Sequence, residues 1–320
     1  MKLKFFAFLL IVLVYACQSS TRQQKKTISI SGAFALYPLV EKWTEQYSLL
    51  HKNINFDLKA GGAGKGLADV LSNAVDMGMF SRDITEEERS KGIWWIKLCK
   101  EAVLPTINSA NPYIDSILKY GLTKEQFRSI FIDGRPLTWD SLFHVKTDTP
   151  HQINVYTRED ASGAGESWAS YLGTKQVSLK GTRMYGDSGI ANAVKHDKNA
   201  IAYNNSVFVF DHYTGEKFAN IDVVPLDING NRKIDKEEDF YKELVDFRVA
   251  LYASKFPSPP ERDLFFITAK RPTQKEVLDF LNWVLSDGQR FVEPMGYVPL
   301  TREILTEQAK KLALSVEYGY

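Results

Sequence analysis

The architecture of the chain is set by residues 27–47, which read TISISGAFALYPLVEKWTEQY. Residues 27–30 alternate polar and apolar side chains, as a half-buried strand does, and Ser31 and Gly32 end that alternation. Apolar side chains then recur at the spacing of one helix face, at Leu36, Leu39, Val40, Trp43 and Tyr47. The stretch predicts a strand, a tight loop and a helix in direct succession.

The same unit returns twice along the chain. Residues 54–58 have strand character and lead through a glycine-rich loop, residues 61–66, into an amphipathic helix. Residues 153–156 lead through residues 162–165, again rich in glycine, into a third helix. Strands that alternate with helices in this way predict an α/β fold with a largely parallel sheet.

Further elements follow from the same periodicity. Residues 123–132 form a predicted helix that Thr123 caps and Gly134 closes. A short apolar strand is expected at residues 265–267, with helices along 277–285 and 303–315.

The composition is that of a globular protein. The chain has 320 residues, of which 44% are hydrophobic and 12% aromatic, so a disordered segment and a disulfide-stapled miniature are both excluded. The formal net charge is +1, which gives no reason to expect a nucleic-acid partner or a trap for acidic substrates. Any anion chemistry must therefore be local.

The first 16 residues have the pattern of an export signal. Lys2 and Lys4 precede a short apolar run, residues 5–14, which is too short to span a bilayer. The run ends in Val-Tyr-Ala-Cys at 14–17, which resembles the lipobox of bacterial lipoproteins. We expect cleavage before Cys17 and acylation of that cysteine, with residues 17–26 as a polar tether; the alternative is a plain signal peptide with an incidental cysteine. Cys99 is then unpaired and is expected to be a small buried hydrophobic residue.

Three loops rich in small residues precede predicted helices, at residues 31–34, 61–66 and 162–165. The first turn of a helix has unpaired N–H groups and a partial positive charge, so such loops can bind an anion. Arg158, four residues before Ser162, and Arg82 are candidates to add charge. The alternatives are tight turns for the loops, and surface ion pairs with Asp160 or Asp83 for the arginines.

Eight segments resemble, in order, those of the phosphate-binding proteins of bacterial phosphate ABC importers. They are residues 31–39, 61–66, 76–82, 111–112, 122–139, 158–165, 200–203 and 257–264. The resemblance implies a two-domain periplasmic binding protein fold of type II, with the ligand in an interdomain cleft. Residues 27–105 and 250–320 are then a discontinuous first domain, and residues 106–249 are the second domain, inserted in it.

The resemblance also implies a set of ligand-binding residues. They are Gly32, Ala33, Phe34, Ala63, Ser81, Arg82, Arg158, Ser162, Gly163 and Ala164. Relatives usually have a hydroxyl residue where this chain has Ala33, Phe34, Ala63 and Ala164, and often where it has Phe80. We therefore expect phosphate binding that is retained but weakened, or a ligand that needs fewer donors, with Arg158 as the largest contributor.

Residues 227–238 have a different pattern, which resembles the calcium loop of EF-hand proteins. Oxygen-bearing side chains stand at loop positions one, three, five, nine and twelve: Asp227, Asn229, Asn231, Asp235 and Glu238. Arg232 stands at position six, where glycine normally makes the sharp turn. The sequence predicts weak binding of Ca²⁺, with a solvated Asn-Gly turn as the alternative.

Catalysis has little support in the sequence, since the five histidines are scattered and Ser162 has no neighbouring base. We expect a lipid-anchored, monomeric receptor of the periplasm or cell envelope that is not an enzyme and requires no cofactor. It is expected to bind phosphate or a similar oxyanion and to deliver it to an ABC permease, without nucleic-acid partners. The alternatives are a receptor or sensor of the same fold for another ligand, and a calcium-stabilised surface lipoprotein without a transport role.

Overall fold

The computed structural model describes residues 25–134 and 137–317. The predicted signal segment, Cys17 and most of the predicted tether lie outside these residues. In the part of the chain that the structure describes, no helix is both long enough and apolar enough to cross a membrane.

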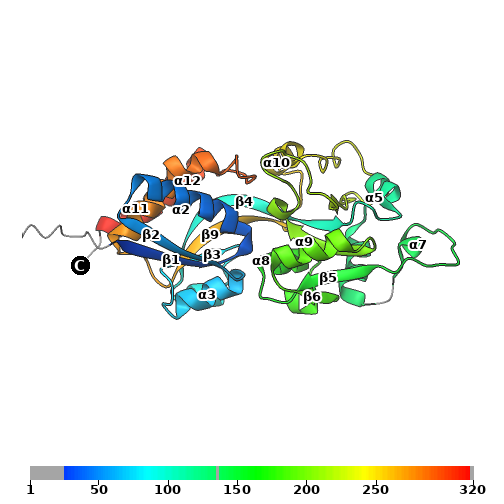
Figure 1. The fold of residues 1–320 in the computed structure, drawn as a ribbon, viewed down its shortest axis with the longest axis horizontal. Coiled ribbons are helices and arrows are strands. Elements are labelled where there is room, and N and C mark those ends of the chain that lie inside the picture. Colours follow the sequence, from blue (N-terminus) through cyan, green and yellow to red (C-terminus); the bar gives the residue numbers. More distant parts are fainter. Residues whose placement is uncertain (1–24, 135–136, 318–320) are drawn as a thin grey trace, which may run out of the picture.

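Strands and helices alternate through most of the chain (Figure 1). In order they are β1 (Lys26–Gly32), η1 (Phe34–Leu36), α2 (Tyr37–Leu50), β2 (Ile54–Ala60), α3 (Ala63–Leu71), β3 (Met77–Phe80), α4 (Glu86–Ser90), β4 (Trp94–Ile107), α5 (Ile114–Tyr120), α6 (Lys124–Arg128), η2 (Ser129–Asp133), α7 (Trp139–Leu142), β5 (Asn154–Arg158), α8 (Gly163–Tyr171), η3 (Gln176–Ser178), β6 (Thr182–Met184), α9 (Gly186–His196), β7 (Ala200–Asn205), η4 (Ser206–Phe208), β8 (Asp222–Val223), α10 (Leu244–Tyr252), β9 (Glu261–Thr268), α11 (Lys275–Leu285), η5 (Asp287–Phe291) and α12 (Arg302–Glu317).

The three predicted strand–loop–helix units are confirmed as β1 to α2, β2 to α3 and β5 to α8. The predicted helix at 123–132 is also confirmed, as α6 continued by η2, with Thr123 as its N-cap in a capping box with Gln126. The predicted strand at 265–267 and the two later helices correspond to β9, α11 and α12.

The strands run in the order β2-β1-β3-β9-β4-β7-β5-β6, with β8 paired to β4. The pairs β1–β2, β1–β3, β5–β6 and β5–β7 are parallel, as the alternation predicts. The sheet is nevertheless mixed, because β4 and β9 pair antiparallel with each other and with their neighbours β7 and β3. These two strands join the halves of the molecule, one running out and the other running back, so they cannot be parallel.

Two hydrophobic clusters lie on either side of that junction. Buried residues between 28 and 99 and between 264 and 312 form the first cluster. Buried residues between 102 and 256, with Val298, form the second. Cys99 belongs to the first cluster and is buried and free, as predicted. Figure 1 shows α2 and α3 in the half built on the first cluster, and α8 and α9 in the other half. The domain limits themselves stay a prediction.

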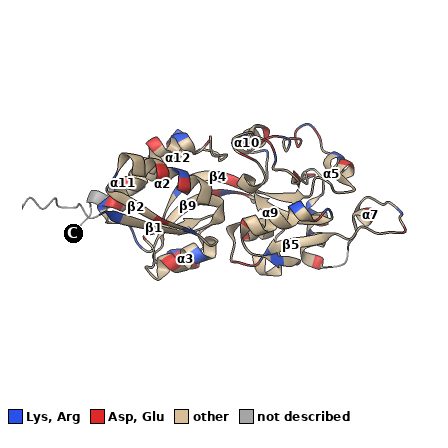
Figure 2. Cartoon of the chain, viewed as in Figure 1, with Lys and Arg blue, Asp and Glu red and all other residues tan. Residues whose placement is uncertain are grey.

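Charged residues of both signs are interspersed over both halves (Figure 2). Such a distribution fits the near-zero net charge and leaves anion recognition to local features.

Candidate functional site

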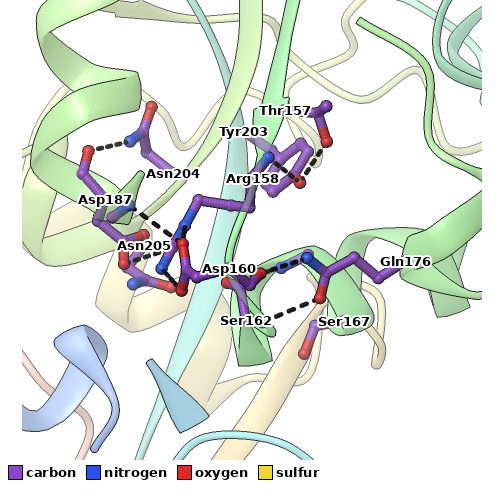
Figure 3. Close-up of polar contacts among 12 residues, drawn as sticks. Thr157, Arg158, Asp160, Ser162, Ser167, Gln176, Asp187, Tyr203, Asn204 and Asn205 are labelled. Carbon is purple, nitrogen blue, oxygen red and sulfur yellow. Dashed lines mark hydrogen bonds and ion pairs between the residues drawn. The ribbon is translucent and has the colours of Figure 1, made fainter. Parts of the chain in front are cut away.

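Arg158, the last residue of β5, is the centre of a buried charge cluster (Figure 3). Its side chain is only 1% exposed. Its Nε and Nη2 donate to Asp160 Oδ1 and Oδ2 at 2.8 and 2.5 Å, and its Nη1 donates to Asp187 Oδ2 at 2.5 Å. Burial lowers the pKa of the guanidinium, but Asp187 and Asp160 outweigh that effect and raise the pKa above its ordinary value. Arg158 is therefore a permanent cation here.

A hydrogen-bonded tyrosine fixes the backbone of Arg158. The Arg158 N–H donates to Tyr203 Oη at 3.0 Å, and that hydroxyl also bonds Thr157 Oγ1 at 2.8 Å. Burial raises the pKa of Tyr203 to about 12, so its hydroxyl stays protonated at neutral pH. Since Tyr203 is fully buried on β7, it holds the end of β5 in a fixed place.

The cluster contains more acceptors than donors. Asp160 Oδ1 also accepts the Gly186 N–H at 3.1 Å, at the start of α9. Asp187, which is 1% exposed, has a second oxygen, Oδ1, without a hydrogen-bond partner among the described residues. One cation and two carboxylates give the cluster a net charge of −1, so it favours a ligand that brings its own hydrogen-bond donor.

The N-terminus of α8 adjoins Arg158. Ser162 is the N-cap of this helix, and its Oγ accepts the Gly165 N–H at 3.2 Å, which leaves the hydroxyl proton free to donate. The Ser162 N–H donates to Gln176 Oε1 at 2.9 Å, while Gln176 Nε2 donates to the Asp160 carbonyl at 2.7 Å. Gln176 thus ties the loop between β5 and α8 in place.

Loops from the other half approach this helix end closely. The Gly64 N–H, in the first turn of α3, donates to the Ala161 carbonyl at 3.0 Å. A Cβ atom on Gly62 would lie 2.5 Å from Asp160 Oδ2, and one on Gly163 would lie 2.1 Å from Ser81 Oγ. Only glycine fits at these two contacts, which explains why the loops that meet here are glycine-rich.

Phe34 covers the face of the guanidinium. The Arg158 Cζ atom lies 5.3 Å from the centroid of the Phe34 ring, a cation–π contact. Tyr185, just before α9, packs edge-on against the same ring with centroids 6.0 Å apart. Where the family resemblance implied a hydroxyl, this chain therefore has an aromatic ring against the Arg158 guanidinium.

The structure brings most of the predicted residues to this meeting point. Phe34, Ser81, Arg158, Ser162 and Gly163 are joined by the contacts described above. Ala63 and Ala164 are buried in the first turns of α3 and α8.

Three predicted residues have other partners. The Ala33 N–H donates to the Met79 carbonyl at 2.9 Å, and the Gly32 carbonyl accepts the N–H groups of the 61–62 segment. Arg82 Nη2 donates to Glu88 Oε1 at 2.6 Å, and Arg82 Cζ lies 4.5 Å from the centroid of the Phe80 ring. The alternative for both arginines is a surface ion pair with Asp160 or Asp83. Arg158 does pair with Asp160, and also with Asp187, but this cluster is buried. Arg82 pairs with Glu88 and not with Asp83.

The predicted interdomain cleft is present as a cavity of about 860 Å³. Its lining comes from the first half, from α8 and its preceding loop, from the segment around η3, from β6, and from the two joining strands. Of the predicted ligand residues, Arg82 and Ser162 belong to this lining, and Arg158 does not.

The sequence interpretation did not include Asp187. The segment 186–189, Gly-Asp-Ser-Gly, follows β6 and opens α9, so it repeats the strand–loop–helix pattern of the other three loops. This repeated pattern is the sequence feature from which Asp187 could have been predicted as a site residue.

The 227–238 segment folds as a loop that satisfies its own carboxylates. Asp227 and Glu238 are buried, and each accepts backbone N–H groups of the loop, those of 230–232 for Asp227 and of 228, 229 and 235 for Glu238. The side-chain amides of Asn229 and Asn231 contact Asp235 Oδ2 at 3.2 and 2.6 Å.

Position six of this loop, Arg232, has φ +60°, the left-handed conformation that glycine favours. Within the described ranges, no three His, Cys, Asp or Glu side chains are grouped to hold a metal ion. Calcium binding stays a prediction, and it would require the two asparagine side chains to turn their oxygens toward the ion.

Comparison with known proteins agrees with this architecture. The chain is 26% identical over 290 residues to the phosphate-binding protein PstS of Staphylococcus saprophyticus, a match that spans 88% of this chain and 82% of the relative. It is 24% identical over 318 residues to the phosphate-binding protein PstS of Xylella fastidiosa, spanning 89% and 85%.

Solved structures show the same fold. A candidate phosphate ABC transporter substrate-binding protein from Clostridium perfringens, with bound phosphate, superposes with a TM-score of 0.69 at 19% identity, covering 86% of this chain and 100% of that one. An ABC-type phosphate transport receptor from Vibrio cholerae gives 0.59 at 17% identity, covering 85% and 100%. The predicted fold is thereby confirmed. The model of the PBP superfamily domain matches residues 18–288, which is most of the chain, and the chain therefore belongs to the PBP superfamily.

Proposed function

We propose that this protein is an extracytoplasmic receptor that binds inorganic phosphate, or a similar tetrahedral oxyanion, between its two halves and delivers it to an ABC permease. Binding is non-covalent, and no chemical step is involved. The relatives named above as phosphate-binding proteins, and the phosphate found in the Clostridium perfringens structure, support this choice of ligand.

The observation that carries the proposal is the position of Arg158 beside the N-terminus of α8. A buried guanidinium next to the unpaired N–H groups of a helix start is a site for a charged oxygen. The Ser81 and Gly62–Gly64 loops reach the same point from the other half, so a ligand there would contact both halves.

The cluster also limits which oxyanion binds well. With Asp160 and Asp187 already paired to Arg158, a fully ionised anion would meet like charge. Phosphate carries a proton at neutral pH, and that proton can be donated to a carboxylate oxygen such as Asp187 Oδ1, which has no donor among the described residues. We expect binding that is weaker than in hydroxyl-rich relatives and that still favours protonated oxyanions.

We propose that the receptor lies in the cell envelope and is anchored there through acyl chains on Cys17. The pattern of residues 1–17 supports export and anchoring, because it combines a basic start, an apolar run and a cysteine at its end. Calcium bound by residues 227–238 would stabilise the second half and take no part in transport.

An anion panel tests the proposal. Calorimetry of the protein freed of bound anions would be carried out with phosphate, arsenate, sulfate and nitrate in turn. Saturable binding of phosphate and arsenate supports the proposal. Binding of a different anion alone would identify a receptor of the same fold for another ligand, and binding of none would favour a surface lipoprotein without a transport role.

A further inference from the structure

A second buried ion pair lies on the two strands that join the halves. Glu101 of β4 and Arg262 of β9 stand directly opposite each other in the antiparallel register. They are 1% and 6% exposed. Arg262 Nε donates to Glu101 Oε1 at 3.2 Å, and Nη2 donates to the same oxygen. The pair thus lies within the connection between the two halves.

Arg262 connects this junction to the anion site. Its Nη1 donates to Ser167 Oγ of α8 at 3.2 Å, and its Nη2 also donates to Asn205 Oδ1 at the end of β7. The preceding residue, Asn204, donates through Nδ2 to the Asp187 carbonyl at 3.2 Å. Figure 3 shows Asn204, Asn205 and Asp187 beside Arg158. Arg262 therefore holds both the helix whose N-terminus adjoins Arg158 and the strand that supports Asp187.

One carboxylate oxygen of Glu101 can still accept a proton or a hydrogen bond. Its Oε2 is buried and has no hydrogen-bond partner among residues 25–134 and 137–317. The charged and titratable groups that act on Glu101 are Arg262, Asp187, Cys99 and Tyr297, together with the Ser206 hydroxyl.

The balance of these groups favours a proton on Glu101. Burial raises the pKa of Glu101 to about 7; Arg262 and Ser206 oppose the rise, and Asp187 adds to it. Burial raises the pKa values of Cys99 and Tyr297 well above their ordinary range, so both stay neutral. Counting Arg158, Arg262, Asp160, Asp187 and an ionised Glu101, the buried cluster has two positive and three negative charges.

We propose that the Glu101–Arg262 pair links anion binding to the uptake of a proton from solvent, with Glu101 Oε2 as the acceptor and Arg262 as a positioning residue for α8. The inference rests on the proposed function. An anion bound beside Arg158 adds negative charge to a cluster that already has a surplus of it, and that charge disfavours ionised Glu101. Protonation removes one negative charge while Arg262 keeps its bonds to Ser167 and Asn205, so α8 stays in position.

The direction of the pH effect follows from this linkage. Since the bound state holds more protons than the free state, anion affinity rises as pH falls through the range in which Glu101 titrates. Phosphate itself titrates near neutral pH, so the effect of Glu101 has to be isolated by comparison with a variant. Glu101→Gln keeps the shape of the side chain and removes its charge. The phosphate affinity of this variant should therefore lack the part of the pH dependence that comes from Glu101.

The experiment measures proton uptake when phosphate binds. Calorimetry at pH 7.5 in two buffers of different ionisation enthalpy gives the protons taken up per phosphate, for the parent, for Glu101→Gln, and for Glu261→Gln as control. Glu261 is a buried carboxylate next to Arg262 that pairs with Lys100 instead. The parent and the control should take up a substantial fraction of a proton more than Glu101→Gln. Between pH 7 and 8 the affinity of the parent relative to Glu101→Gln should fall, by at most about tenfold. Equal uptake in the parent and Glu101→Gln would overturn the proposal.

A second measurement does not depend on how the variants fold. Infrared difference spectra of the parent with and without phosphate should show a protonated buried carboxyl group that appears on binding, and its absence would contradict the proposal.

If the parent binds no phosphate at all, the proposed function fails. In that case, urea unfolding of the parent and of Glu101→Gln over pH 4.5–8 still shows whether Glu101 titrates. The free energy of unfolding of the parent should fall relative to that of the variant as pH rises toward 7. A difference that stays constant over this range would refute the role of Glu101.

Discussion

Replacing Arg158 with alanine should damage both stability and binding, and the structure gives the size of each effect. Three of the five N–H groups of Arg158 donate to Asp160 and Asp187 among the described residues, so two remain for an anion. Losing two charge-assisted hydrogen bonds, at about 1.5–3 kcal/mol each, weakens phosphate binding by roughly two to four decades. Removing the cation from a buried pair costs about 3–5 kcal/mol, because two carboxylates are left facing each other.

Thermal unfolding measures the stability effect. At roughly 2–4 °C per kcal/mol for a domain of this size class, the melting temperature should fall by roughly 6–20 °C at neutral pH. Arg158→Ala combined with Asp187→Asn should recover part of the stability and none of the binding.

Arg183→Ala is the matched control, since Arg183 is an exposed arginine on β6 that donates to the Arg158 carbonyl at 3.3 Å. It should leave the melting temperature and the phosphate affinity near those of the parent. An Arg158→Ala protein that has the melting temperature of the parent and binds phosphate equally well would refute the assignment of this site.

The remaining predictions concern three other features of the chain. Phe34→Ser uncovers Arg158 and restores a donor, so phosphate affinity measured by calorimetry should rise roughly ten- to a hundredfold; a weaker or unchanged affinity would show that the ring does not obstruct the site. Millimolar calcium should raise the melting temperature, and Asp227→Ala with Glu238→Ala should abolish that rise; a shift that persists in the double variant places the calcium elsewhere. Cys17→Ala should move the protein from the membrane fraction to the soluble fraction after cell fractionation, and a variant that stays membrane-bound would exclude the anchor.

Local periodicity was enough to predict the units that build the site. The alternation at 27–30, the helical spacing that follows it and the glycine-rich loops all correspond to elements of the structure. These signals are local, because a strand–loop–helix unit is defined by residues close in sequence. The antiparallel pairing of β4 with β9 was not predicted, since their register joins residues about 160 positions apart, such as Glu101 and Arg262.

Which residues form the charge cluster could not be predicted from the sequence either, because they are far apart along the chain. Asp187 reaches Arg158 only because β6 lies beside β5, and no spacing rule connects the two residues. The family resemblance indicated that Phe34 stands at a ligand position, but the contact of its ring with a guanidinium from the other half depends on how the halves meet. The orphan oxygens of Asp187 and Glu101 are likewise visible only in the folded molecule.

Titration of phosphate into the protein freed of bound anions, followed by calorimetry, tests directly whether phosphate binds beside Arg158. The parent should show saturable binding of one phosphate per chain, and the Arg158→Ala variant should show none at the same concentrations. If the parent shows no saturable binding up to millimolar phosphate, or if Arg158→Ala binds as tightly as the parent, then the buried arginine beside α8 is not a phosphate site.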